Sequence, residues 1–216
     1  MYKKKFNSLI LLIPSFNELE NFKKFLVKLN KKYNLLVVDD FSTDMSYRFL
    51  KINKIPFIRN KTNLGYEGSL INGIKFIKKQ KKFKKILTMD ADGQHNEKYI
   101  DKINKIYDKK KPDVIVGSRI NKNRLIEKII SYYFYKKFKI HDPLSGFKIY
   151  KTDTLFKLDL TKIKNLFLVD LLVQLLKAKR KVLSINIKTR ERKDSPRVGN
   201  TIRVNLKMLK ILLNIF

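Results

Sequence analysis

Apolar runs of strand length alternate with helical patterns through the first part of the chain. Five short runs predict buried strands: residues 8–13, 34–38, 56–59, 85–89 and 113–117. In the segments between them, apolar side chains recur every three or four positions, which predicts amphipathic helices: residues 18–30, 44–53, 68–79 and 96–109. Repeated strand–helix alternation is typical of an α/β fold with a mostly parallel central sheet and helices on both faces.

The second half of the chain is less regular. Its pattern predicts helices at residues 125–138 and 167–178 and strands at residues 144–150 and 182–187. The pattern then predicts a polar loop over residues 188–200 and a basic amphipathic helix over residues 201–216. No linker divides the sequence, so we expect a single domain over residues 1–200 with the tail helix appended.

The amino-acid composition limits which disulfides and metal sites the protein can form. The 216 residues contain no cysteine and only two histidines, His95 and His141. Disulfides and thiolate zinc sites are therefore excluded, and any metal site must use mainly oxygen ligands, which favours Mg²⁺ or Mn²⁺.

The formal net charge of +31 has two readings. It fits attraction to a polyanion, either nucleic acid or an anionic membrane surface, or a lysine-rich drift in composition. Lysines occupy nearly every predicted helix face, which favours drift, with a membrane contribution beside it. The sequence has no signal-peptide pattern and no apolar run of spanning length, so we expect a cytoplasmic protein, peripheral at the inner face of the membrane.

Three polar clusters follow predicted strands, where open α/β sheets bind their ligands. They are residues 14–18, 39–44 and 90–94. No Gly-x-Gly-x-x-Gly and no Walker motif accompanies them, which disfavours dinucleotide and P-loop chemistry. Asp90, Asp92 and Gln94 could hold Mg²⁺ or Mn²⁺ completed by phosphate oxygens, although helix capping is an alternative role for a lone Asp-x-Asp.

Together these clusters resemble the family 2 glycosyltransferases of GT-A (Rossmann-like) fold, in their dolichol-phosphate mannosyltransferase-like branch. The matching motifs occur in the family's order: Ile13-Pro14-Ser15-Phe16-Asn17-Glu18, Val37-Val38-Asp39-Asp40-Phe41-Ser42-Thr43-Asp44, Asn63-Leu64-Gly65, Asp90-Ala91-Asp92-Gly93-Gln94-His95, Gly117-Ser118-Arg119 and Asp142-Pro143-Leu144-Ser145-Gly146-Phe147-Lys148. Two departures are Phe41, where the family usually has glycine, and Lys148, where it usually has arginine.

The resemblance implies a role for each matching position. Residues implied in binding the nucleotide sugar, a GDP- or UDP-sugar, are Pro14, Phe16, Asn17, Glu18, Asp39, Asp40, Asp44, Gly65, Asp90 and Ala91. The implied metal ligands are Asp90, Asp92 and Gln94, and the implied catalytic residues are Asp92, Arg119 and Asp142. Residues implied on the acceptor side are Ser145, Lys148, Arg190, Arg192 and Arg197.

The acceptor decides what catalysis requires. A polyprenyl (dolichyl or undecaprenyl) phosphate has a second pKa of about 6, so it is already a nucleophile at neutral pH and needs only cations to bind it. A saccharide hydroxyl needs a base, for which Asp142 is the candidate. We expect inverting transfer to a polyprenyl phosphate, with the saccharide as the alternative and a nucleic-acid-binding protein as a remote one that the acidic clusters disfavour. The tail could lie on the membrane, and the chain could act with a separate membrane subunit.

Overall fold

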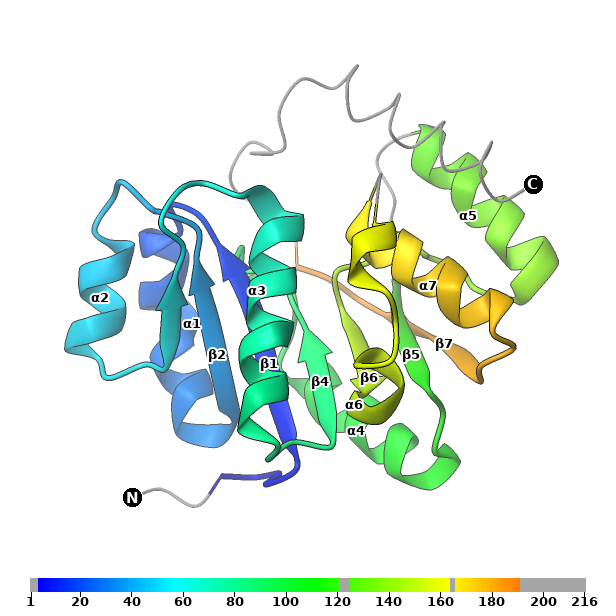
Figure 1. Ribbon diagram of the computed structural model, residues 1–216, viewed down its shortest axis with the longest axis horizontal. Helices are drawn as coiled ribbons and strands as arrows, with labels where there is room; N and C mark the ends of the chain where they lie inside the picture. Colours follow the sequence, from blue (N-terminus) through cyan, green and yellow to red (C-terminus); the bar gives the residue numbers. More distant parts are fainter. Residues whose placement is uncertain (1–3, 121–124, 164–165, 191–216) are drawn as a thin grey trace.

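The computed structural model describes residues 4–120, 125–163 and 166–190. Its centre is a seven-stranded sheet in the order β3-β2-β1-β4-β6-β5-β7 (Figure 1). The strands are β1 (Leu9–Ser15), β2 (Asn34–Asp39), β3 (Phe57–Arg59), β4 (Lys85–Thr88), β5 (Val114–Arg119), β6 (Lys148–Lys151) and β7 (Val182–Ile187). Only β6 runs antiparallel to its neighbours β4 and β5 among these strands; the other pairs are parallel. The predicted mostly parallel α/β sheet is confirmed.

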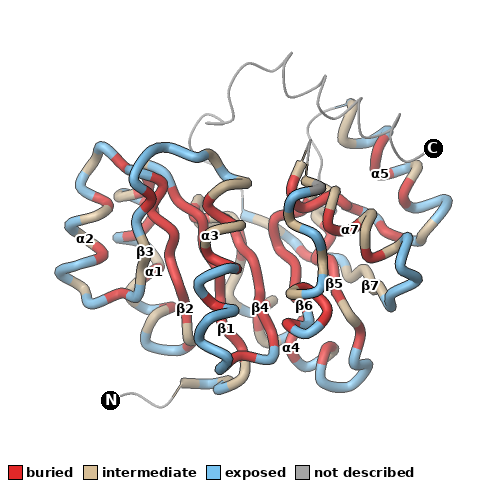
Figure 2. Tube along the Cα trace, viewed as in Figure 1, coloured by how far each residue is buried: buried red, intermediate tan, exposed pale blue. Residues whose placement is uncertain are grey.

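Helices pack on both faces of the sheet, as predicted. One face carries α1 (Leu19–Lys32), α2 (Ser46–Ile52) and α4 (Lys98–Lys110). The other carries α3 (Gly65–Gln80), α5 (Leu125–Phe138), α6 (Thr152–Leu155) and α7 (Phe167–Lys177). Figure 2 shows that the central strands are buried along most of their length.

Strand β1 explains why two cores form. Its side chains alternate in direction, so Leu9, Leu11 and Ile13 pack in the core beneath α1 and α4. Ile10 and Leu12 pack on the opposite side, against α3. A strand covered on both faces reads as a continuous apolar run, which is the pattern that residues 8–13 show.

Helix α3 and strand β6 differ most from the predicted bounds, and two short elements were not predicted. Helix α3 starts at Gly65, earlier than predicted, because backbone N–H groups of Leu64 and Gly65 donate to Asp40. Strand β6 starts only at Lys148, because residues 142–147 form a loop held by buried polar side chains. The short helix α6 and a 3₁₀ turn at Leu160–Lys162 were not predicted. The expected tail helix and the domain boundary at residue 200 lie outside the described residues.

Strands β1, β2 and β4 are parallel neighbours, so their carboxyl ends meet at one edge of the sheet, the upper edge in Figure 1. All three polar clusters therefore lie along this edge. Within the described residues, no helix is long and apolar enough to cross a membrane.

Candidate active site

The loops that follow β1 and β2 are joined by hydrogen bonds. Asn17, in the left-handed backbone region with φ of 55°, accepts through Oδ1 from the N–H groups of Thr43 (2.8 Å) and Asp44 (3.2 Å). Asp44 accepts from the N–H of Ser46 (2.8 Å) at the start of α2 and from Leu19 (3.2 Å) at the start of α1. Asn17 and Asp44 thus fix the two loops as one unit.

The first cluster also includes a buried and an exposed side chain. Pro14 is buried in β1, whereas the ring of Phe16 is 38% exposed beyond the strand end. Glu18 is buried and accepts a hydrogen bond from Asn21 Nδ2 at 2.6 Å. Of these residues, Phe16 offers an accessible apolar surface at this edge.

Asp39 is a fully buried carboxylate at the end of β2. Its Oδ2 lies 3.2 Å from Nε of Arg59, the last residue of β3. Burial raises the pKa of Asp39, while a hydrogen bond from Ser42 and the charge of Arg59 oppose that rise. Sequence reasoning missed Arg59, which no motif marks.

Asp40 anchors the start of α3. Its Oδ1 accepts from Asn60 Nδ2 (2.7 Å) and the N–H of Leu64 (2.8 Å), and its Oδ2 accepts from the N–H of Gly65 (2.8 Å). Gly65 has a φ of 74°, a conformation that favours glycine. Asp40 and Gly65, both predicted to line the nucleotide pocket, are therefore bonded to each other.

Asp90 follows β4 and is held from two sides. Tyr66 Oη donates to its Oδ1 (2.9 Å), and His95 Nε2 lies 3.2 Å from its Oδ2. Burial raises the pKa of Asp90, but the contacts with His95 and Tyr66 and the charge of Arg119 outweigh it, so the pKa is lowered and the carboxylate stays ionised. His95 is itself buried and stacks on Phe147, with ring centroids 4.9 Å apart. Tyr66, in the first turn of α3, was not predicted as a site residue.

The tight turn after Asp90 carries the other two residues predicted to be metal ligands, Asp92 and Gln94. Ala91 is buried, Asp92 Oδ1 accepts from the N–H of Gln94 (3.0 Å), and Gly93 makes the turn with a φ of 73°. In the described part of the chain, no group of three acidic or histidine side chains forms a complete metal cage. Two carboxylates and an amide oxygen nevertheless fit Mg²⁺ or Mn²⁺, because such ions usually keep few protein ligands and take further oxygens from substrate phosphates.

The structure pairs two of the predicted catalytic residues with each other. Asp142 is fully buried and accepts three hydrogen bonds from Arg119: from its backbone N–H (3.1 Å), from Nε (2.7 Å) and from Nη2 (3.3 Å). Arg119 Nη2 also lies 3.6 Å from Glu127 Oε2. Burial lowers the pKa of Arg119, but these carboxylates raise it overall, so the ion pair persists. This geometry leaves Asp142 poorly placed to accept a substrate proton.

Two residues expected on the acceptor side are instead fully buried. Lys148 Nζ donates to the carbonyl oxygens of Pro143 (2.8 Å) and Ser145 (2.6 Å), and Ser145 Oγ donates to Gly117 O (2.5 Å). Burial lowers the pKa of Lys148 to about 7, although the nearby charge of Asp142 opposes the shift. Through these bonds, both side chains hold the loop over residues 142–147 in place from inside the protein. Since both are fully buried, neither has a surface that an acceptor could touch.

Arg190 is exposed at the end of the described chain, and its backbone N–H donates to Gln94 O at 2.9 Å. This contact brings Arg190, the first of the arginines predicted for the acceptor, to the Asp90–Gln94 turn. Arg192 and Arg197 lie outside the described residues.

Comparison with solved structures matches this fold to known enzymes. Glucosyl-3-phosphoglycerate synthase from Mycobacterium tuberculosis, solved in complex with Mn²⁺, UDP-glucose and phosphoglyceric acid, superposes with a TM-score of 0.74 at 12% identity, over 97% of this chain and 79% of that one. Its complex with Mn²⁺ and UDP-glucose gives a TM-score of 0.73 at 13% identity, over 97% and 79%. The expected GT-A fold is confirmed.

Curated sequences provide nearer relatives. An uncharacterized protein of Methanocaldococcus jannaschii is 32% identical over 168 residues, which cover 68% of this chain and 73% of that protein. The UDP-N-acetylglucosamine–dolichyl-phosphate N-acetylglucosaminyltransferase of Methanococcus voltae is 32% identical over 130 residues, about half of each protein (51% and 51%). Residues 10–164 match the sequence family described as glycosyl transferase family 2. The chain therefore belongs to glycosyl transferase family 2.

Proposed function

We propose that this chain transfers a sugar, with inversion, from a nucleotide-diphosphate sugar to a polyprenyl phosphate. The observation that carries the choice of acceptor is the burial of Asp142 in its ion pair with Arg119. A saccharide acceptor needs a base to take its proton. Asp142 cannot act as that base, because it is buried and bonded to Arg119. A phosphate monoester is already ionised at neutral pH and needs no base. The Methanococcus relative, named for a dolichyl-phosphate acceptor, supports the same choice.

The donor would bind along the carboxyl edge of the sheet. Asp90 and Asp92, with Gln94, would hold Mg²⁺ or Mn²⁺, which supplies charge neutralisation for the leaving diphosphate when bound. Tyr66 and His95 keep the Asp90 carboxylate oriented and ionised. Neighbouring solved structures that bind UDP-glucose with Mn²⁺ support a donor of this class.

The acceptor phosphate would approach from the side of Arg119 and Arg190. Both lie next to the metal turn: the charge of Arg119 acts on Asp90, and Arg190 is bonded to Gln94. Positive side chains at this position would attract the acceptor anion and offset its repulsion from the donor diphosphate. Because polyprenyl phosphates reside in membranes, we also propose that the protein works at the cytoplasmic membrane surface.

The test is a transfer assay with UDP- and GDP-sugars, with Mn²⁺ or Mg²⁺, and with either a polyprenyl phosphate or an oligosaccharide. We expect metal-dependent product only with the lipid phosphate. Product only with the oligosaccharide would overturn the proposed acceptor, and no turnover or binding of any nucleotide sugar would overturn the proposed donor as well.

A further inference from the structure

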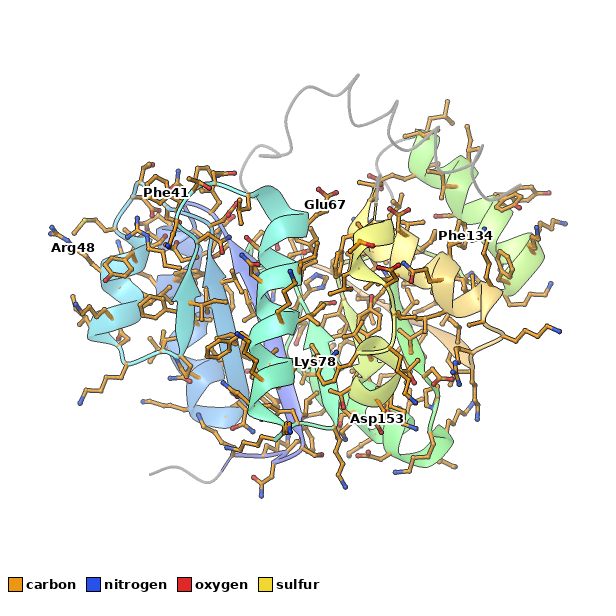
Figure 3. All side chains as sticks on the ribbon, viewed as in Figure 1. Phe41, Arg48, Glu67, Lys78, Phe134 and Asp153 are labelled. Carbon is orange, nitrogen blue, oxygen red and sulfur yellow. The ribbon has the colours of Figure 1, made fainter. Side chains whose placement is uncertain are left out.

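A hollow of about 430 Å³ opens at the outer end of the carboxyl edge, between the loop after β2, helix α2 and the end of β3. Figure 3 shows Phe41 on this edge, with Arg48 further out on α2 and Glu67 further along the edge on α3. The side chains that line the hollow include Phe41, Thr43, Tyr47, Arg48 and Arg59. Aromatic rings beside arginines suit a ligand that is both planar and anionic.

Phe41 presents its ring in an unfavourable backbone conformation. The residue has a φ of 61°, a region that bulky side chains rarely adopt, and it is 45% exposed. Glycine is the residue that adopts this conformation without cost. A strained and exposed phenylalanine gains little for folding, so its ring points to a role in binding.

Arg59 supports the ring from behind. Its guanidinium lies 5.4 Å from the centroid of Phe41 and 4.5 Å from that of Tyr47. It also pairs with the buried Asp39 (3.2 Å) and donates from Nη2 to Ser42 O (2.9 Å). These contacts fix Arg59, so one side of the Phe41 ring is backed by a rigid group while the rest of the ring is accessible.

A short series of bonded residues connects this hollow to the candidate metal site. Phe41 directly follows Asp40, whose carboxylate binds the N–H groups of Leu64 and Gly65. The next residue, Tyr66, donates to Asp90. The hollow and the Asp90 carboxylate therefore lie on one edge, across the adjacent strands β2, β1 and β4.

We infer that Phe41 is a specificity-determining platform on which the nucleobase of the donor stacks, with its diphosphate directed along the edge toward Asp90. This inference rests on the proposed nucleotide-sugar donor and adds a base-binding residue to it. Stacking on an aromatic ring needs only the π-face of a base, and the arginines of the hollow would favour bases that present carbonyl oxygens, as uracil and guanine do.

The experiment measures binding of UDP and GDP to the full chain by calorimetry in the presence of Mn²⁺. Phe41→Gly and Phe41→Ala should weaken binding roughly 5-fold to 150-fold, the range of base–aromatic stacking, and Phe41→Tyr should retain it. Inorganic diphosphate, which has no base, should bind all variants equally. Ile52→Ala is the matched control, because Ile52 is 78% exposed at the other end of α2.

Thermal unfolding separates a binding role from a structural one. The melting temperature of Phe41→Gly should not fall below that of the wild type, because glycine relieves the positive φ. Equal nucleotide affinity in the wild type and Phe41→Gly would overturn the platform alone, as would an equal loss of affinity for inorganic diphosphate. If the wild type bound neither UDP nor GDP, the proposed donor would fail together with the platform.

Discussion

Gly146 lies so close to Asp90 that a Cβ atom on this glycine would come within 2.3 Å of Oδ1 and 2.6 Å of Oδ2. The loop over residues 142–147 is therefore a wall against which the Asp90 carboxylate rests. Tyr66 and His95 hold the carboxylate on its other sides. The orientation of this candidate metal ligand thus depends on two segments that are remote in sequence, around Tyr66 and Gly146, and on His95 in the same turn.

Gly146→Ala should displace the Asp90 side chain, because the end of a side chain moves more readily than the backbone. We expect metal-dependent transfer to fall roughly 10- to 100-fold, as is usual when the groups that orient a ligand are disturbed. The measurement is turnover as a function of Mn²⁺ concentration. Asp90→Asn is the reference variant, because it shows how far turnover falls when the carboxylate is lost entirely. Unchanged metal dependence in Gly146→Ala would show that contact with Gly146 does not orient Asp90.

The ion pair between Asp142 and Arg119 predicts strongly non-additive effects. If Asp142 acts by holding Arg119, then Arg119→Met should lower turnover, and adding Asp142→Asn should lower it little further. A base would behave differently, because its removal would abolish turnover whether or not Arg119 is present. A double-mutant cycle on kcat with a polyprenyl phosphate acceptor distinguishes the two, provided that each variant is shown to be folded at the assay temperature.

Much of the fold could be predicted because the strands are covered on both faces and read as short apolar runs between amphipathic helices. The placement of the polar clusters followed, since carboxyl ends of parallel strands share an edge. The partners within the site could not be predicted in this way. Tyr66 reaches Asp90 across 24 residues, and Arg119 reaches Asp142 across 23, through contacts that only the packed sheet creates.

The environment of Lys148 illustrates the same limit. A lysine at a motif position near strand ends is normally exposed, and Lys148 was expected to meet an acceptor. In the structure it points into the protein because the carbonyls of Pro143 and Ser145 turn inward at the start of β6. Neither the hydrophobic pattern nor the sequence motif predicts that these carbonyl groups point inward.

Tyr150 gives a prediction for stability. Its ring is buried, and its hydroxyl has no hydrogen-bond partner within the described residues. Removing an unsatisfied buried hydroxyl should be neutral or stabilising, so Tyr150→Phe should raise the free energy of unfolding by about 0–2 kcal/mol. Tyr33→Phe is the matched control: its hydroxyl donates to Asp101 Oδ1 at 2.8 Å, and its loss should cost about 1 kcal/mol. Urea denaturation measures both, and a clear loss of stability in Tyr150→Phe would contradict the prediction.

Lys148 predicts a specific pH dependence of stability. Burial lowers its pKa from the usual 10.5 to about 7, so between these values the unfolded chain binds more protons at this position than the folded protein. The free energy of unfolding should therefore rise with pH across that window, by up to about 1.4 kcal/mol per pH unit from this group. Lys148→Met cannot titrate, so the stability of the wild type relative to Lys148→Met should increase from pH 7 to pH 9.5.

Urea denaturation of both proteins at matched pH values measures this difference, in which the titration of other groups cancels. A difference that stays constant over the range would mean that Lys148 keeps its proton in the folded protein, and that a charged ammonium holds the two carbonyl groups beside the Asp142–Arg119 pair.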